Sequence, residues 1–430
     1  MDKRSGMSGT RSTAAADQGC AARPLHSVAI ALVAAMLAGP VSASASYDVV
    51  VQNGPSSNRV NIVFLGDGYT ASEINAAYTQ HINSILSHFF DVGEDPFPRY
   101  ESFFNVYRVD VVSNESGADV PPDGIFRDTA LDASYYFDGT SSRLLYVDNA
   151  KATTARDSAL AGSGITPHMS LITVNDTRYG GGGGDFAVFP GGNEYAGDLA
   201  LHELGHSFSG LADEYWDVSQ NTTYVGGEPS QVNVTKDPNG QKWSQWLGYV
   251  DSLGTVGAYE GAIGYYTYGV YRPTDYSKMR RIDYKFNAVC REKIILDIYG
   301  IVDPLDEYLP TSQLLVDPND VWVDVVDPNV IQVDWYVDDV LVPGAVAESF
   351  RLTDYGFGPG LYSVKAKAFD ATDWVRVGRQ ALEQFVTWQV EITPEPACTA
   401  VLSVGLVMIL RRRRRRRSPL PALSARPRGI

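Results

Sequence analysis

The chain has 430 residues, 44% of them hydrophobic, which is enough for one large or two ordinary domains. It carries 51 acidic and 35 basic residues, a formal net charge of −16. Residues 1–45 and 397–430 hold 13 of the basic and two of the acidic residues, so the body between them has 22 and 49, a net charge of −27. Such a surface repels nucleic acid and anionic lipid, which excludes both as expected partners. Of three cysteines only Cys290 lies in the body, which excludes an internal disulfide and a cysteine metal site there.

The first 45 residues are predicted to be a secretory signal peptide. Arg23 precedes a short apolar run, residues 28–38, and Ala43-Ser44-Ala45 supply the small residues of a cleavage site. Because the stretch before this run is long, Met7 or a later codon is an alternative start. An N-terminal membrane anchor is the other interpretation, but the run is too short to favour a span. We therefore expect the mature chain to be exported.

The body begins with an α/β pattern, which predicts a first domain over residues 46–310. A capping box, Thr70-x-x-Glu73, indicates the start of a helix with one apolar face. Short apolar or alternating runs indicate strands on both sides of it, and a glycine run, residues 180–184, precedes the last of them. The predicted strands are residues 61–65, 104–112, 144–147, 171–174 and 186–189.

Residues 202–206 read His-Glu-Leu-Gly-His, a pattern that binds zinc in many hydrolases. Two histidines four residues apart project from the same face of a helix, and the glutamate beside them can serve as a base. Tyr195, Leu199 and the two histidines form one stripe, which predicts that the histidines face inward on a helix capped by Asn193. A helix with two solvated or core histidines is the alternative, and the inward stripe and the intervening Gly205 count against it.

A catalytic zinc needs a third protein ligand, and no histidine follows His206. Asp213 lies seven residues further on, which on a continuous helix means about 10 Å, too far to share an ion. Gly210 is predicted to end the helix in the left-handed conformation, so that the chain folds back and brings an acid under the metal. Asp213 is the first choice, Glu214 the second and Glu228 the third. His81, His88 and His168 precede the motif, and His81 and His88, on the predicted capped helix, are interpreted as surface or core residues.

The string HELGHSFSGLADEY, residues 202–215, resembles the M64 family of zinc peptidases, the IgA-peptidase family of bacteria. The segments FLGDGY, residues 64–69, and YRP with SKMR, residues 271–280, are similar to the same family, and the likeness extends over about residues 47–390. It implies an α/β (α+β) catalytic domain of zincin or metzincin type, one catalytic Zn²⁺ on His202, His206 and Asp213, and a methionine turn beneath the metal.

One departure from the general metzincin pattern affects the third ligand. That pattern has glycine three residues and the third ligand six residues after the second histidine, where this chain has Ser209 and Ala212. Glycine and acid come one residue later here. The assignment of Asp213 therefore rests on the family likeness and on the predicted turn.

The expected function is a secreted zinc metalloendopeptidase, in which a zinc-activated water attacks the peptide bond and Glu203 is the general base. Tyr215 and Tyr276 are candidate donors to the oxyanion. The glycine run is either a strand edge for an extended peptide or a flexible loop. Two other classes stay open: a catalytically idle surface or matrix binding protein of the same fold, and a zinc amidase acting on a non-protein substrate. The sequence neither indicates nor excludes an additional Ca²⁺, and no stable oligomer is expected.

Residues 311–392 have a different pattern, with short strands of alternating hydrophobicity separated by turn residues. The alternation runs over residues 321–325, 331–337 and 362–368. This spacing predicts an all-β immunoglobulin-like sandwich. The segment contains no histidine, so we interpret it as a spacer or docking module.

The end of the chain, residues 393–417, resembles the PEP-CTERM sorting signal of Gram-negative bacteria. Pro394-Glu395-Pro396 precedes a 14-residue apolar stretch, residues 397–410, and seven arginines, residues 411–417. The likeness implies transient membrane anchoring, cleavage by an exosortase-type enzyme and delivery to the cell surface or extracellular matrix. A plain C-terminal anchor is the alternative. Residues 418–430 are predicted to be a disordered tail.

Overall fold

The structure is a computed structural model that describes residues 46–90, 94–216, 218–219 and 221–395. The predicted signal peptide, and the sorting signal from residue 396 onward, lie outside the described residues. None of the described helices is long and apolar enough to cross a membrane.

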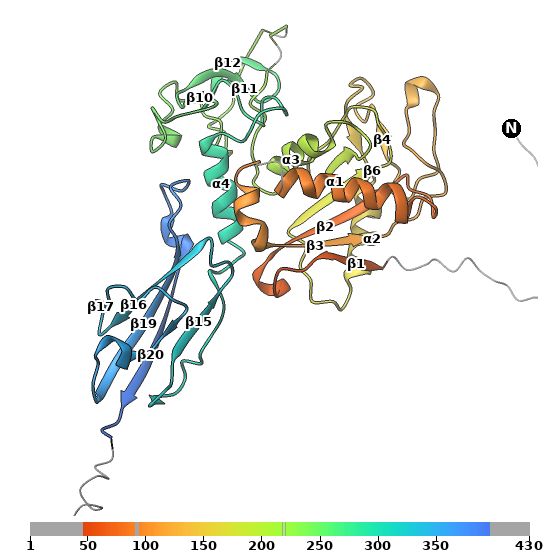
Figure 1. Ribbon diagram of the computed structural model, residues 1–430. Helices are drawn as coiled ribbons and strands as arrows, with labels where there is room; N and C mark the ends of the chain where they lie inside the picture. Colours follow the sequence, from red (N-terminus) through yellow and green to blue (C-terminus); the bar gives the residue numbers. More distant parts are fainter. Residues whose placement is uncertain (1–45, 91–93, 217, 220, 396–430) are drawn as a thin grey trace, which may run out of the picture. The chain divides into compact units, whose positions relative to one another are not determined.

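A five-stranded sheet in the order β1-β3-β2-β6-β7 forms the centre of the part that precedes α4 (Ala288–Tyr299; Figure 1). The pairs β2–β3, β2–β6 and β6–β7 are parallel, and β1 runs antiparallel to β3. Four of the five predicted strands lie in this sheet, whereas the fifth, at residues 144–147, pairs elsewhere as β5. The strands of the central sheet are β1 (Tyr47–Val51), β2 (Val60–Asp67), β3 (Phe104–Val109), β6 (Met169–Val174) and β7 (Ala187–Pro190).

Helices cover both faces of this sheet (Figure 1), which explains why its strands read as continuous apolar runs. Ile62 and Phe64 of β2 share a core with α1 and α3, whereas the alternate residues Val63 and Leu65 share the opposite core with α2. Burying such a side chain contributes about 1.5–3 kcal/mol. The helices are α1 (Thr79–Phe90), α2 (Asn149–Leu160), α3 (Ala196–Ser207) and α4 (Ala288–Tyr299).

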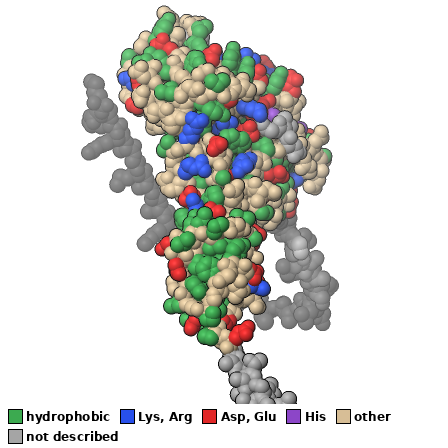
Figure 2. All heavy atoms as spheres, turned by 60° about the vertical axis from the view of Figure 1, so that its left-hand side comes forward, with side chains coloured by type: hydrophobic (Ala, Val, Ile, Leu, Met, Phe, Trp, Pro, Cys, Tyr) green, Lys and Arg blue, Asp and Glu red, His purple; other side chains and the backbone are tan. Residues whose placement is uncertain are grey.

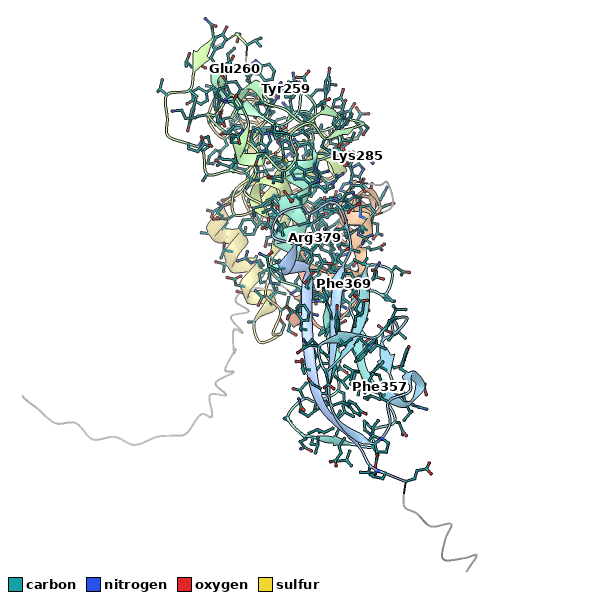
Figure 3. The ribbon with its side chains drawn as sticks, turned by 90° about the vertical axis from the view of Figure 1, so that its left-hand side faces the viewer. Tyr259, Glu260, Lys285, Phe357, Phe369 and Arg379 are labelled. Atoms are coloured by element: carbon teal, nitrogen blue, oxygen red, sulfur yellow. The ribbon has the colours of Figure 1, made fainter. Side chains whose placement is uncertain are left out.

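Short helical turns and small sheets fill the segments between these elements. Thr70 and Glu73 form the predicted start of the first helical segment, where the Glu73 carboxylate accepts the Thr70 N–H at 2.8 Å. The helical turns are η1 (Ser56–Asn58), the π-helical η2 (Ile74–Tyr78), η3 (Phe97–Phe103), η4 (Pro121–Asp123), η5 (Gln241–Trp243), η6 (Leu352–Tyr355) and η7 (Arg379–Leu382). The small strands are β4 (Ser134–Tyr135), β5 (Leu145–Tyr146), β8 (Thr222–Thr223), β9 (Val250–Asp251), β10 (Gly254–Thr255), β11 (Tyr259–Ala262) and β12 (Tyr266–Arg272). Figure 3 shows Tyr259 and Glu260 in β11.

Two sheets make up the described chain after α4, as the alternating pattern predicts. Their orders are β13-β15-β18 and β14-β20-β19-β16-β17. The Trp335 and Trp388 rings stack between them with their centroids 5.8 Å apart, and both side chains are buried. β13 precedes the predicted domain boundary at residue 310 but pairs with β15. The strands are β13 (Leu305–Tyr308), β14 (Leu315–Val316), β15 (Val321–Val325), β16 (Ile331–Val337), β17 (Val340–Leu341), β18 (Ser349–Phe350), β19 (Gly360–Asp370) and β20 (Glu383–Ile392).

These C-terminal sheets also expose apolar side chains, which Figure 2 shows in the lower part of its view. Phe357 and Phe369 are labelled in this part in Figure 3. The exposed large hydrophobic residues of this part include Val316, Val340, Leu341, Val346, Tyr355, Leu361 and Phe385.

Candidate active site

Helix α3 carries both histidines of the HELGH motif on its inward face. His202 and His206 are one turn apart, and their Nε2 atoms are separated by 3.3 Å. The helix begins after Tyr195 and not after the predicted cap Asn193. Asn193 instead accepts the Tyr195 N–H at 2.9 Å, in the turn that precedes the helix. The predicted inward orientation of the histidines therefore holds, although the predicted cap does not.

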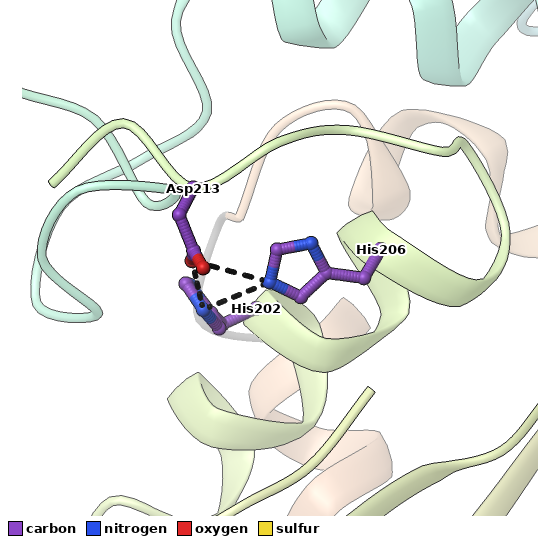
Figure 4. A group of neighbouring side chains, drawn as sticks. All are labelled: His202, His206 and Asp213. Carbon is purple, nitrogen blue, oxygen red and sulfur yellow. Dashed lines mark hydrogen bonds and ion pairs between the residues drawn. The ribbon is translucent and has the colours of Figure 1, made fainter. Parts of the chain in front are cut away.

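The chain reverses directly after α3, as the position of Gly210 predicts. Gly210 has a φ of 58°, and its N–H donates to the His206 carbonyl at 3.1 Å, which is the left-handed ending of a helix. The reversal brings the Asp213 carboxylate back over the helix. Asp213 Oδ1 lies 3.3 Å from the Nε2 atoms of both His202 and His206 (Figure 4).

These three side chains fit a zinc ion. Their donor atoms are 3.3 Å apart in each pair. A tetrahedral zinc with bonds of about 2.0–2.1 Å spaces its ligands by about 3.3–3.4 Å. Asp213 Oδ1 is buried, and apart from the two imidazole nitrogens at 3.3 Å it has no partner among the described residues, which leaves it free to bind a cation. Two imidazoles and one carboxylate are also the ligand set of many catalytic zinc sites.

The outer nitrogens of both rings are held by backbone carbonyls. His202 Nδ1 lies 3.0 Å from the Lys278 carbonyl, and His206 Nδ1 lies 2.7 Å from the Leu211 carbonyl. Because a carbonyl can only accept, each Nδ1 carries the proton. The lone pair of each Nε2 then points at the shared centre, as metal binding requires.

The charge of the metal-free site is set by the same contacts. Burial lowers the pKa of His206, but hydrogen bonding to Asp213 and the charge of that carboxylate outweigh burial and raise the pKa to about 9. For Asp213, burial raises the pKa, and the hydrogen bonds to the two imidazoles outweigh it and hold the pKa below its usual range. When no metal is bound, the two imidazoles and the carboxylate therefore bind a proton in its place, as the ligands of a cation site do.

Glu203 is buried beside this centre, under the glycine run. A Cβ atom added at Gly181 would lie 2.6 Å from Glu203 Oε1, and one at Gly183 would lie 3.0 Å from Oε2. Only residues without a side chain leave room for the carboxylate here. Burial raises the pKa of Glu203, which shifts it toward the range of a general base.

The main chain of the glycine run is paired with the protein itself at two residues. The Gly181 N–H donates to the Arg143 carbonyl at 3.0 Å, and the Leu145 N–H donates to the Gly181 carbonyl at 3.3 Å. Gly182 and Val188 exchange both of their backbone hydrogen bonds, at 3.0 and 2.8 Å. The expected strand edge for substrate is therefore not free at Gly181 or Gly182, and these glycines instead provide the space above Glu203.

The centre opens into a cleft of about 580 Å³. Tyr215, one of the two predicted oxyanion donors, lines this cleft. Tyr276 does not line it, because its ring stacks on Tyr284 with the centroids 4.9 Å apart. The other side chains of the cleft wall include Arg143, Tyr146, Tyr179, Arg280 and Arg281.

Glu214, the second choice for the third ligand, points away from the centre. Its side chain is fully buried and accepts hydrogen bonds from Ser277 Oγ at 2.6 Å, Asn233 Nδ2 at 3.0 Å and Asn287 Nδ2 at 3.0 Å. These donors satisfy the carboxylate without a metal. Of the two neighbouring acids, Asp213 is the one that the structure brings to the histidines.

The remaining candidates lie outside the centre. Glu228, the third choice, pairs with Lys242 at 2.7 Å. Each upstream histidine has a partner elsewhere: His81 contacts Tyr69, His88 contacts Asp198, and His168 accepts from Asn61.

Sequence reasoning missed the residues that hold the ligand segment in place. Asn233 accepts the Ala212 N–H at 2.9 Å and donates to the Ala212 carbonyl at 2.8 Å. On the other side of Asp213, the Glu214 N–H donates to the Met279 carbonyl at 2.8 Å. Asp213 is therefore fixed on both sides by segments far away in the sequence. The SKMR string at residues 277–280 is the only sequence signal that pointed to one of them.

The turn at Lys278 and Met279 also supports helix α3. Met279 is buried against Gly205, where an added Cβ would lie 2.7 Å from the sulfur, so the predicted close approach at this glycine is present. The Lys278 ammonium is buried between Asp198 at 2.6 Å and Glu94 at 3.2 Å. It occupies the space between these carboxylates, so this acidic cluster needs no metal.

Residues 49–255 match the family model described as IgA Peptidase M64. The matched range contains the HELGH motif, Gly210 and Asp213, and it ends before the segment of residues 271–280 and the C-terminal sheets. No curated protein matches the chain.

Proposed function

We propose that this chain, which belongs to the M64 family of peptidases, is a secreted zinc metalloendopeptidase whose centre is formed by His202, His206 and Asp213. The observation that carries the proposal is the triangle of donor atoms, 3.3 Å on each side, with the buried Glu203 beside it in an open cleft. The family supports hydrolysis of peptide bonds. The donor set supports zinc.

Different residues of the chain have different roles in the proposed reaction. When bound, zinc would supply Lewis acidity, which makes a water nucleophilic near neutral pH and polarises the substrate carbonyl. Glu203 accepts the proton of the attacking water and passes it to the leaving amine, and its raised pKa suits both transfers. His202 and His206 keep their Nδ1 protons on backbone carbonyls, so their Nε2 lone pairs stay aimed at the centre.

Of the two tyrosines predicted as oxyanion donors, Tyr215 is the one that lines the cleft, and we assign it the stabilisation of negative charge on the substrate oxygen. Burial raises the pKa of its hydroxyl, so the group stays protonated and can donate. It follows Asp213 by two residues, and its backbone carbonyl accepts the Gly264 N–H at 2.9 Å.

The proposal is tested by the fragment 46–395 and its Glu203→Gln variant, purified without chelator. The wild type should contain one zinc per chain and cleave an unfolded protein such as casein. The variant should keep its zinc but lose turnover by about two to four orders of magnitude, because the water loses its proton acceptor. Wild-type turnover in the variant, or a wild type without zinc, would overturn the proposal.

The ends of the chain support a proposed location. The signal-peptide pattern in residues 1–45 and the PEP-CTERM-like tail in residues 393–417 favour export, exosortase-type processing and display at the surface or in the matrix of a Gram-negative bacterium. We propose that the C-terminal sheets form an immunoglobulin-like spacer between the catalytic part and this tail. Deletion of residues 397–417 should release the protein into the medium, and retention in the cells would contradict this proposal.

A further inference from the structure

Three arginines line the catalytic cleft, and two of them already have carboxylate partners. Arg280 Nη1 lies 2.6 Å from Asp275, and Arg281 Nη2 lies 2.9 Å from Asp283. Arg143 forms no ion pair with a carboxylate of the described residues. Of the arginines that line the cleft, Arg143 is therefore the one without an acidic partner among the described residues.

The structure holds the Arg143 guanidinium at the wall of the cleft. The backbone carbonyl of Arg143 accepts from Gly181, next to Glu203, at 3.0 Å. The Nη2 group donates to the Tyr215 hydroxyl at 3.3 Å, and the guanidinium lies over the Tyr215 ring, 5.2 Å from its centroid. A guanidinium has five N–H donors, and only this one is used by a described residue. The others are available to a ligand in the cleft.

The surroundings of Arg143 favour an anion as that ligand. The planar fork of an arginine matches a carboxylate with two parallel hydrogen bonds, which are among the strongest in proteins. The cleft also contains Glu203 and Asp213, whose negative charges repel an acidic substrate unless a cation offsets them. Arg143 is the arginine of the cleft wall that is still free to do so.

We propose that Arg143 binds a carboxylate of the substrate and makes the enzyme prefer peptides with an acidic group close to the scissile bond. This inference rests on the proposed peptidase function, and it adds the substrate class. The carboxylate belongs either to an aspartate or glutamate side chain or to the free C-terminus of the substrate, since both present the same chemistry to the guanidinium.

Paired peptides test the preference. A fluorogenic peptide series carries glutamate or glutamine at each position around the cleaved bond, and a second pair differs only in a free or amidated C-terminus. The wild type should cleave one acidic member with a kcat/KM about tenfold or more above its neutral partner, because losing a charged hydrogen-bond partner in a built site costs at least that much. The position that shows the ratio identifies the source of the carboxylate.

Variants assign the preference to Arg143. Arg143→Gln should bring the acidic-to-neutral ratio close to one, and Arg143→Lys should keep part of it. Arg281→Gln is the matched control, because it removes the same charge from the same cleft at a residue that already has an acidic partner; it should keep the wild-type ratio. Thermal unfolding checks that each variant is folded.

Two outcomes would overturn the inference: a wild type that does not distinguish the paired peptides, or an Arg143→Gln variant that slows both members equally. The second would mean that Arg143 acts on the reacting carbonyl. Peptide binding to zinc-loaded Glu203→Gln protein, measured by calorimetry, separates this question from turnover. If the wild type cleaves no peptide, the proposed function fails, while binding without an acidic preference would contradict the role of Arg143 by itself.

Discussion

Asp213 and Glu214 are neighbours in the chain with opposite surroundings. Asp213 has a buried oxygen whose only partners among the described residues are two imidazole nitrogens, each 3.3 Å away. Glu214 is fully enclosed and accepts from Ser277, Asn233 and Asn287. Asp213 is therefore available to bind a cation, whereas the Glu214 carboxylate holds three segments of the chain together.

The two acids should respond differently to substitution. Asp213→Ala is expected to lose zinc nearly as completely as His202→Ala, because two imidazoles alone bind the ion weakly. Glu214→Gln is expected to keep the zinc but to lower the free energy of unfolding by about 1–3 kcal/mol, because the amide cannot accept from all its neighbours. Zinc content and urea unfolding measure both effects. If folded Asp213→Ala protein keeps its full zinc content while Glu214→Gln protein contains none, Glu214 and not Asp213 is the zinc ligand.

The raised pKa of His206 predicts how zinc binding depends on pH. In the metal-free protein this pKa is about 9, against an ordinary value of 6.5. Below pH 9 zinc must therefore displace a proton, so the apparent affinity should rise about tenfold per pH unit from pH 7 to 9 and then level off. Competition with a chelator measures the affinity, and calorimetry in buffers of different ionisation enthalpy measures the released proton. An affinity that is constant between pH 7 and 9 would show that His206 is already neutral there.

At the scale of elements, a buried ion pair holds the turn at residues 277–280 against helix α3. Lys278 Nζ lies 2.6 Å from Asp198, which is one turn before His202 on α3. The carbonyl of the same lysine accepts from His202 Nδ1 at 3.0 Å. The side chain of Lys278 thus fixes the backbone group that orients the His202 ring.

Lys278→Met should therefore weaken both the fold and the metal site. Removing one partner of a buried ion pair costs about 3–5 kcal/mol, because Asp198 and Glu94 stay buried without a cation. Lys285→Met is the matched control, since Lys285 is half exposed and 3.7 Å from Asp95, and it should cost less than about 1 kcal/mol. Urea unfolding of the metal-free proteins and zinc titration of the folded ones separate the two effects. Equal stability and zinc affinity in both variants would contradict this role.

Local patterns predicted most of the elements and the three residues whose donor atoms the structure brings together, but not the residues that support them. The stripe of His202 and His206 and the glycine at position 210 act over a few residues, so their consequences are readable from the sequence. Asn233 and Ser277 act only because the folded chain brings them to Ala212 and Glu214, across 21 and 63 residues. Those distant contacts decide which of Asp213 and Glu214 faces the two histidines, so a local sequence pattern cannot distinguish the two acids.

At the scale of the whole molecule, one core extends from the central sheet through α4 into the C-terminal sheets. Asp370, at the end of β19, is buried and accepts from Tyr100 at 2.6 Å and from Tyr299 of α4 at 3.0 Å. Arg99 lies 2.7 Å from the same carboxylate. These contacts join the last sheets to helix α4.

Asp370→Asn should therefore destabilise the protein without changing its catalytic centre. The amide keeps the shape but loses the charge that pairs with Arg99, at a cost of about 1–3 kcal/mol. The unfolding transition should move as a whole, and kcat per folded molecule should stay within about twofold of the wild type. A variant in which only part of the signal moves, while the rest unfolds as in the wild type, would show that the two parts unfold independently.

The central claim is that one zinc ion is bound by His202, His206 and Asp213. Crystals of the 46–395 fragment, purified without chelator, allow a direct measurement with X-rays at the zinc absorption edge. We expect a single anomalous peak at about 2.0–2.2 Å from His202 Nε2, His206 Nε2 and Asp213 Oδ1. No peak at this centre, or a peak in the cluster of His88, Glu94 and Asp198 where Lys278 now lies, would contradict the account.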